Sequence, residues 1–204
     1  MLLNKNNLAI HTIASKQETK PELMGVYITP EETVATDTFI LVAVSTPKGD
    51  AKDFPTREEG DTMKPKDVRA IIPAPLAKAV MSKIPTKATL PILENAIVSN
   101  FKGEKKITIT STDLDVWHDT SGTVIEGAYP AYKQIIPQEN PKTVTLLNYE
   151  YIKKGIEALA RTSNQLKEVK IEMYGKNKPV KLTSFNGEQQ TTVIIMPIQS
   201  DESI

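Results

Sequence analysis

The distribution of apolar residues along the chain predicts a protein built mostly from short β-strands. Runs rich in Val, Ile, Thr and Tyr recur and are bounded by Pro, Gly, Asn and Asp, which is typical of strands. These runs cover residues 25–29, 33–45, 96–99, 106–110, 169–174, 180–185 and 191–198. We therefore expect small antiparallel sheets to form most of the fold.

A few helices are predicted between these strands. The clearest has Ile152, Ile156 and Leu159 on one face and is preceded by Asn148, a suitable N-cap. The second, residues 76–84, follows Pro75, because proline is favoured at the start of a helix. The third, residues 7–16, fits a helix or a strand about equally and is assigned as a helix. The three predicted helices are residues 149–161, 76–84 and 7–16.

Three segments lack such periodicity. Residues 47–66 are rich in charge, Pro and Gly, which predicts a long surface loop between two units. Residues 127–142 contain three prolines and are predicted to be an extended connector. The polar residues 199–204 are expected to fray.

An internal repeat organises these elements. Residues 21–28 lead through a turn into Ala35-Thr36-Asp37, and residues 91–98 lead into Ser111-Thr112-Asp113. Both copies share Pro-x-Leu, a strand, a charged turn, a second strand and Thr-Asp, and each follows a predicted helix. Residues 142–198 repeat the order of helix and strands without Thr-Asp. The expected domains are residues 1–127, with two repeats, and residues 128–204, with the connector and a third repeat.

Charge and composition narrow the function. The 25 Lys and Arg equal the 25 Asp and Glu, which argues against a tightly wrapped nucleic-acid binder but not against a protein that surrounds DNA loosely. The absence of cysteine excludes disulfides and thiolate metal sites. The sequence has no apolar signal segment and no run of ~20 apolar residues, so we expect a soluble, cytoplasmic protein with no membrane partner.

A cluster of acids and one histidine is a candidate metal site. It comprises Asp113, Asp115, His118 and Asp119, and a hydrolase using Asp113 and Asp115 is the hypothesis that it suggests. On a strand the two aspartates would point to one face and His118 to the other, so a solvated strand end is favoured. Because no phosphate loop, serine elbow or cysteine nucleophile occurs, we expect neither enzymatic activity nor a cofactor or metal.

Several segments together resemble the bacterial DNA polymerase III beta subunit, the sliding clamp. Residues 79–98 and 109–116 resemble the opening of that family's first domain, and residues 21–41 the start of its middle domain. Residues 129–137 resemble its interdomain connector, and residues 193–198 its C-terminal strand with a Met-Pro motif. The resemblance implies an α+β fold of repeated helix-plus-antiparallel-sheet units, with helices lining a central hole and sheets forming the outer wall.

The resemblance also implies a DNA-facing set of cations on the helices. Contacts to backbone phosphates would carry no sequence information, as sliding requires. The alternative is that these are ordinary solvated helix faces, and Glu157 among them supports it. The candidates are Lys78, Lys83, Lys87, Lys153, Lys154 and Arg161.

A pocket for short partner peptides is the second implied site. Its apolar character would suit hydrophobic peptide anchors, although residues 194–198 could equally be a core or edge strand. The family's Gly-His-Arg after Thr-Asp is here Thr38-Phe39-Ile40, and its basic residue after Met-Pro is Gln199. The candidates are Leu23, Thr36, Leu41, Pro130, Ile135, Ile194, Met196, Pro197 and Ile198.

The implied function is that of a processivity factor that encircles or grips duplex DNA. Its partners would be double-stranded DNA, and DNA polymerase and clamp-loader-like proteins bound through short peptides. With three units per chain, four copies would supply the units of the family's ring, while a trimer and an open or monomeric clamp stay possible. The alternative function is a β-rich protein-interaction module that keeps the fold without encircling DNA.

Overall fold

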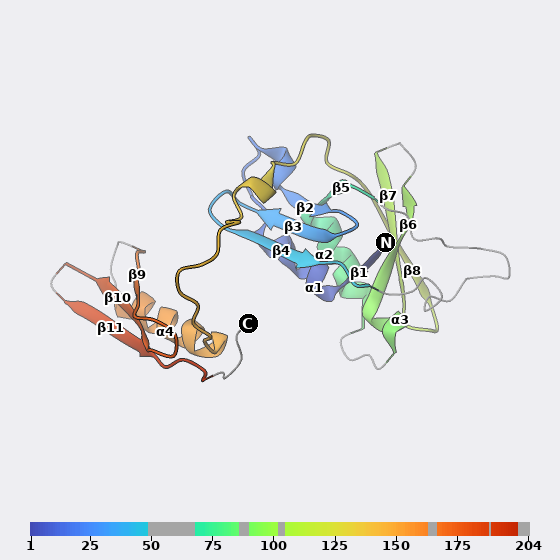
Figure 1. Cartoon of the computed structure of the whole chain (residues 1–204). Coiled ribbons are helices and arrows are strands. Elements are labelled where there is room, and N and C mark those ends of the chain that lie inside the picture. Colours follow the sequence, from blue (N-terminus) through green and yellow to red (C-terminus); the bar gives the residue numbers. More distant parts are fainter. Residues whose placement is uncertain (49–67, 86–89, 102–104, 163–166, 188, 200–204) are drawn as a thin grey trace. The chain divides into compact units, whose positions relative to one another are not determined.

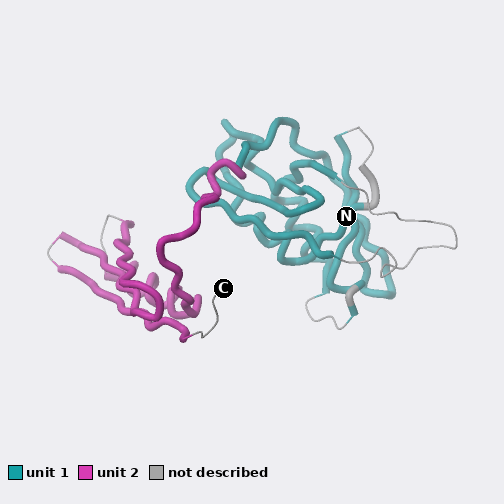
Figure 2. The backbone as a smooth tube through the Cα atoms, in the orientation of Figure 1, with its two compact units in different colours: residues 1–132 teal, residues 133–204 magenta. Residues whose placement is uncertain are grey.

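The computed structural model divides the chain into two compact units, Met1–Tyr132 and Lys133–Ile204 (Figure 1). It describes residues 1–48, 68–85, 90–101, 105–162, 167–187 and 189–199. Figure 2 shows the two units, each of which has its own sheet or sheets and its own apolar core. The predicted division into residues 1–127 and 128–204 stays a prediction of domain boundaries.

The N-terminal unit contains two copies of one order of elements, a strand, a helix and three strands. The first copy is β1 (Leu2–Asn4), α1 (Lys5–Ala9), β2 (Gly25–Ile28), β3 (Glu32–Thr36) and β4 (Leu41–Ser45). The second is β5 (Ala70–Pro73), α2 (Ala74–Lys83), β6 (Asn95–Phe101), β7 (Lys106–Thr112) and β8 (Trp117–Thr123). Short helical turns that begin with proline, η2 (Pro21–Leu23) and α3 (Pro91–Glu94), lead into β2 and β6, and η1 (Ile10–Ile13) continues α1.

The two copies exchange their first strands. Strand β1 of the first copy pairs with β6 of the second, and β5 of the second copy pairs with β2 of the first. The result is two four-stranded antiparallel sheets, ordered β1-β6-β7-β8 and β4-β3-β2-β5. Each copy therefore supplies an outer strand to the other's sheet, and neither sheet is complete without both copies.

The Thr-Asp repeat forms the hairpin turn that joins the last two strands of each copy. The Thr36 hydroxyl donates to the Ile40 carbonyl at 2.7 Å, and the Asp37 carboxylate accepts the Ile40 amide at 2.9 Å. In the second copy the Thr112 hydroxyl donates to the Val116 carbonyl at 3.0 Å, and the Asp113 carboxylate accepts the Val116 amide at 2.8 Å. Short Asp side chains stabilise such turns by binding backbone amides two and three residues on. The repeat in the sequence is thus a repeat of one turn.

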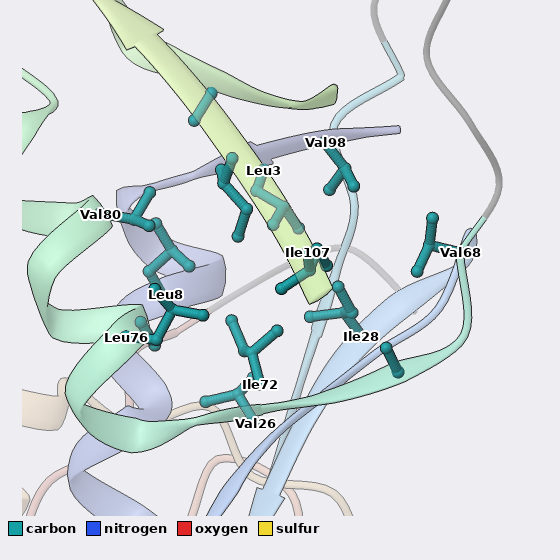
Figure 3. Packing of buried hydrophobic residues seen from close by; sticks show 14 of the residues in the cluster. Leu3, Leu8, Val26, Ile28, Val68, Ile72, Leu76, Val80, Val98 and Ile107 are labelled. Carbon is teal, nitrogen blue, oxygen red and sulfur yellow. The ribbon is translucent and has the colours of Figure 1, made fainter. Parts of the chain in front are cut away.

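The core of the N-terminal unit lies between its helices and sheets. Figure 3 shows Leu8, Leu76 and Val80 from the two helices gathered with Ile72 and Ile107 from the strands. These side chains are almost completely withdrawn from solvent. Burial of each aliphatic side chain contributes about 1.5–3 kcal/mol, so the contact between helices and sheets is the main source of stability.

Asn7 is a buried polar group that links α1 to the sheet β4-β3-β2-β5. Its side-chain amide donates to the Val44 and Ser45 carbonyls at 3.2 Å and 3.0 Å and to the Thr33 hydroxyl at 3.1 Å. Its side-chain oxygen accepts the Asn4 amide at 3.1 Å, and Asn4 in turn caps the helix. Both the amide group and the oxygen of this fully buried side chain therefore have hydrogen-bond partners.

Three tyrosines attach the start of the predicted connector to the sheet β4-β3-β2-β5. The rings of Tyr27 and Tyr129 are stacked with centroids 4.7 Å apart, and Tyr132 meets both edge-on. The Tyr132 hydroxyl donates to the Glu32 carboxylate at 2.7 Å. Burial raises the pKa of Tyr129 to about 12, and burial followed by the Glu32 contact raises the pKa of Tyr132. Residues 128–132 therefore pack with the N-terminal unit.

The C-terminal unit is a third copy of the same order of elements without its first strand. Helix α4 (Tyr149–Thr162) packs on a sheet of β9 (Lys170–Met173), β10 (Val180–Phe185) and β11 (Gln190–Ile195), ordered β11-β10-β9. The single turn η4 (Tyr132–Gln134) lies at the boundary between the units. The core of the unit is small and comprises Leu159, Val180, Leu182 and Ile195.

The third copy also repeats the hairpin turn, with Asn186 in place of aspartate. The Asn186 amide donates to the Gln189 carbonyl at 3.1 Å, and its side-chain oxygen accepts the Gln189 amide at 2.8 Å. Gly187 has φ +94°, matching φ 84° at Thr38 and 82° at Leu114. The third repeat therefore forms the same turn although its sequence lacks Thr-Asp.

Several predicted elements need correction. The run at residues 33–45 is two strands, β3 and β4, because the Thr-Asp turn interrupts it. Strands β1, β5 and β8 were not predicted, and the predicted helix at residues 7–16 is α1 from Lys5 followed by η1. The predicted loop at residues 47–66 and the tail lie mostly outside the described residues. The helices at residues 76–84 and 149–161 are confirmed to within two residues at each end.

We expect Asn7→Leu to lower the free energy of unfolding of the N-terminal unit by about 2–3 kcal/mol. The apolar side chain would leave the Val44 and Ser45 carbonyls and the Asn4 amide without their side-chain partner. Urea unfolding followed by circular dichroism measures the change. Asn6→Leu is the matched control, since Asn6 is exposed on the same helix, and equal losses for both variants would contradict the assignment.

The tyrosine cluster should make stability depend on alkaline pH. A folded pKa of about 12 against about 10 in the unfolded chain means that the stabilisation from neutral Tyr129 is complete below pH ~10. It is lost as pH rises from there toward about 12. Thermal unfolding at stepped pH tests this, with Tyr129→Phe as the comparison. An equally steep decline in the variant would show that Tyr129 does not supply the dependence.

Candidate functional site

Five of the six predicted DNA-facing cations lie on exposed parts of two helices. Lys78 and Lys83 project from α2, and Lys153, Lys154 and Arg161 from α4. The sixth, Lys87, lies outside the described residues. The two helices belong to different units, so each face is considered by itself.

Lys78 and Lys153 occupy the same position in two copies of the repeat. Each is the fifth residue of its helix, counted from Ala74 in α2 and from Tyr149 in α4. The fifth residue of α1 is Ala9, so the first copy lacks this cation.

The outward face of α4 carries charges of both signs. Glu150 and Glu157 share the side of the helix that holds Lys153 and Arg161, opposite the buried Gly155 and Leu159. Exposed charges of opposite sign at this spacing attract only weakly. The face is therefore only modestly positive.

The candidate peptide pocket is divided between the two units. Leu23, Thr36, Leu41 and Pro130 belong to the N-terminal unit, and Ile135, Ile194, Met196, Pro197 and Ile198 to the C-terminal unit. Leu23 is buried, and the Thr36 hydroxyl is already committed to the hairpin turn. Thr36 and Leu41 face each other across β3 and β4. Leu23 and Thr36 therefore have a clear structural role within the N-terminal unit.

Two of the five C-terminal members, Ile194 and Met196, line an apolar groove between α4 and β11, whereas Ile135, Pro197 and Ile198 are not among its lining residues. The groove has a volume of about 410 Å³, and Ile194 and Met196 form one wall. Lys154 lies at the groove and approaches the Tyr151 ring, with Nζ 5.8 Å from its centroid. The lining residues are Tyr151, Lys154, Gly155, Ala158, Val193, Ile194, Ile195 and Met196.

The helix side of this groove was missed at the level of sequence. It is formed by Tyr151, Gly155 and Ala158 of α4. A Cβ atom added at Gly155 would lie 3.0 Å from Val193 Cγ1, so the glycine permits close approach of α4 to β11. A small residue within an amphipathic helix is only a weak sign of such an approach.

Neither a metal cluster nor a membrane-spanning helix is found in the described part of the chain. Asp113 lies in the hairpin turn rather than on a strand, where its carboxylate accepts the amides of Asp115 and Val116. The amide of Val116 is the main cause of its lowered pKa. His118 Nε2 lies 3.4 Å from Asp113, but no three His, Asp or Glu residues described here are arranged as ligands. No described helix has the length and apolar character needed to cross a membrane.

No protein-family model and no curated protein matches the sequence. Solved structures of bacterial clamps are similar throughout the chain. The DNA polymerase III subunit beta of Borrelia burgdorferi matches with a TM-score of 0.67 at 17% identity, covering 96% of this chain and 48% of that one. The beta chain of Streptococcus pneumoniae matches with a TM-score of 0.66 at 21% identity, covering 98% and 49%. The Caulobacter crescentus beta sliding clamp, with PEG bound to a proposed beta-motif tethering region, matches with a TM-score of 0.62 at 19% identity, covering 97% and 50%.

These comparisons establish the fold. The chain has the α+β architecture of the DNA polymerase III beta sliding clamps, with repeated helix-plus-antiparallel-sheet units, as its sequence motifs predicted. It spans about half of the length of the solved clamps that it matches. At identities near 20% the likeness concerns the fold alone, so the site residues stay predictions.

Proposed function

We propose that this chain is a clamp-like processivity factor. In this proposal it encircles or grips duplex DNA without sequence preference and tethers DNA polymerase or other partners through short peptides. It works as a homo-oligomer, and none of its residues is assigned a catalytic role. The observation that carries the proposal is the clamp fold along nearly the whole chain, with the helix-plus-sheet copy occurring three times.

The helices support a role in phosphate contact. Lys78 and Lys153 repeat at one helical position, and Arg161 extends the cationic side of α4 by two turns. Lysine and arginine that meet phosphates without reading bases provide affinity while leaving the protein free to slide. A chain of zero net charge can still do this if the positive side chains gather on the face turned to DNA.

The groove beside α4 supports a role in peptide capture. Its walls are mostly apolar, which suits the hydrophobic anchors of a short peptide. Lys154 supplies a cation beside it, so an acidic group next to the anchors would be favoured.

A second function is favoured by the mixed charge on α4. Glu150 and Glu157 interrupt its cations, and a protein that kept the fold as a β-rich interaction module would need no positive channel. Such a module would bind peptides in the groove but not DNA. The two functions therefore separate in a DNA-binding measurement.

Reversing the charge of α4 tests DNA contact. We expect Lys153→Glu, Lys154→Glu and Arg161→Glu together to weaken association with duplex DNA and to lower its salt dependence. Losing three phosphate contacts should reduce the slope of log K against log salt by about 2.7. Fluorescence anisotropy with two unrelated duplexes measures both effects, which should be the same for both sequences.

The matched control is Lys167→Glu, Lys176→Glu and Lys178→Glu. These lysines are exposed on the loops of the same unit, so the net charge changes equally while α4 is untouched. We expect the control to retain most of the binding and the slope. If both triple variants behave alike, contact through α4 is wrong, and if the native chain does not bind DNA, the interaction module is the better description.

Blocking the groove tests peptide capture. We expect Met196→Asp to weaken binding of a fluorescent polymerase-derived peptide with hydrophobic anchors by at least tenfold, about 1.4 kcal/mol. Tyr174→Asp is the control, because Tyr174 is an exposed apolar side chain of the same unit that does not line the groove. Equal affinities for the two variants would place the peptide elsewhere.

A further inference from the structure

We propose that the C-terminal unit is a half-domain, which the same unit of a second copy of this chain completes by exchanging strands. The partner surface consists of residues 143–147, the exposed apolar side chains Ile152 and Ile156 of α4, and the edge of β9 that no other described strand pairs with. This pairing goes beyond the proposed function, because it requires neither DNA nor a partner peptide. The N-terminal unit supplies the template for it.

The three copies can be aligned through their own hydrogen bonds. Asn4 and Asn148 each cap the helix that follows, and Pro73 holds the same place before α2. The hairpin turns align Asn186 with Asp37 and Asp113. The cap fixes the register of the first strand and the helix in each copy, and the turn fixes the register of the strands around it.

A third hydrogen bond confirms this alignment. The Ile125 amide donates to the Ile71 carbonyl at 2.8 Å, and the Ile198 amide donates to the Leu146 carbonyl at 2.8 Å. Ile71 lies two residues before Pro73, and Leu146 lies two residues before Asn148. Ile125 and Ile198 each lie twelve residues after the aspartate or asparagine of the turn. Residues 143–147 therefore contain the positions equivalent to Leu2 and Leu3 of β1 and to residues 70–72 of β5, the exchanged strands.

The exchanged-strand position is buried in the N-terminal unit and open in the C-terminal unit. Leu2 and Ile71 are at most 5% exposed, whereas the equivalent Leu146 is 40% exposed. Residues 143–147 form no strand, although their sequence Thr-Val-Thr-Leu-Leu has strong β-propensity. This segment has the composition of an exchanged strand but has no sheet to join within the described chain.

The helix shows the same contrast. Leu8 of α1 and Ala77 of α2 lie four residues after the cap and are fully buried in the shared core. The equivalent Ile152 of α4 is 37% exposed, and Ile156 one turn later is also exposed. In the N-terminal unit the two helices contact each other. The open stripe on α4 is therefore where a second helix would pack.

The sheet edge completes the pattern. Ile28 pairs with Thr33 and Val98 pairs with Ile109, and each of these partners lies four residues before the aspartate of its turn. Ile28 and Val98 are fully buried. The equivalent Ile171 in β9 is 62% exposed. Strand β9 ends its sheet, whereas β2 and β6 are followed by the exchanged strands β5 and β1. An open strand edge with an exposed apolar side chain readily pairs with another strand.

A second copy of this chain fits the surface because the half-domain is self-complementary. It carries both a donor segment, residues 143–147, and an acceptor edge, β9. In the N-terminal unit the exchange is reciprocal, and both of its copies are already paired with each other. Two identical C-terminal units related by a two-fold axis would make the same reciprocal exchange.

The template also sets the register. Leu2 lies opposite Ile97, and Ile71 lies opposite Tyr27. Counting from the turns, Lys170 takes the place of Ile97 and Tyr27. Leu146 of one copy should therefore lie opposite Lys170 of the other, with their side chains on the same face of the joint sheet.

Disulfide trapping tests the register. The chain contains no cysteine, so Leu146→Cys with Lys170→Cys introduces the pair alone. We expect oxidation to give a covalent dimer on non-reducing gels, because opposite residues in antiparallel strands can approach disulfide distance. Leu146→Cys with Ile171→Cys is the control, since Ile171 points to the other face of β9. Equal dimer yields from both pairs, or a monomer from the first, would overturn the proposed exchange.

Light scattering without DNA tests the surface itself. We expect Ile152→Asp and Ile171→Asp each to weaken self-association by at least about 30-fold, as for a central apolar contact. Ile194→Asp, an exposed apolar position in the groove, should leave association unchanged. Circular dichroism checks that each variant is folded. A native chain that is monomeric at tens of micromolar, or an Ile194→Asp variant that dissociates equally, would refute the pairing.

Discussion

The fold depends on one constraint, which is that a helix on three strands cannot cover its own apolar surface. One side of the helix and one edge of the sheet stay open, and an open edge carries unpaired backbone groups. In the N-terminal unit two such copies cover each other's open surfaces. Strands β1 and β5 each pair with the sheet of the other copy, and α1 and α2 share one core with both sheets. The pairing of copies is thus the source of both stability and architecture.

The same constraint explains why the candidate sites lie where they do. Once the inward sides of the helices are used for packing, only their outward sides can carry cations such as Lys78 and Lys153. The groove arises because Gly155 lets α4 approach β11, leaving Ile194 and Met196 exposed beside it. The proposed clamp-like role therefore uses surfaces that the packing leaves exposed.

Much of the fold could be predicted from sequence because its signals are local. The Thr-Asp repeat encodes a hydrogen-bonded turn within five residues, and Ile152, Ile156 and Leu159 mark α4 by periodicity. Strand β1 has three residues and pairs with β6 more than ninety positions away, so no local pattern reveals it. Strand β8 is polar on an outer position of its sheet, which weakens its strand signal. The third turn has no Thr-Asp signal because Phe185-Asn186 stands in its place, although Asn186, with Gly187 at the positive-φ position of Thr38 and Leu114, suits the same turn.

The candidate sites were harder to predict from the sequence than the fold, for physical reasons. Exposed lysines occur on any solvated helix, so only the alignment of copies distinguishes Lys78 and Lys153 from the rest. The pocket carried over from the family resemblance combined residues of two units, and two of its members, Leu23 and Thr36, serve the interior and the turn of the first. The helix wall of the groove includes Gly155 and Ala158, whose small side chains give only a weak signal in a sequence.

Hydrogen exchange of the backbone tests most directly the claim that these copies function in pairs. Amides of residues 144–147 and of Lys170–Met173 should exchange slowly at high protein concentration and rapidly on dilution, as paired strands separate. The strands of the N-terminal unit, already paired within the chain, should be insensitive to dilution. Rapid exchange of both C-terminal segments at every concentration would contradict the account.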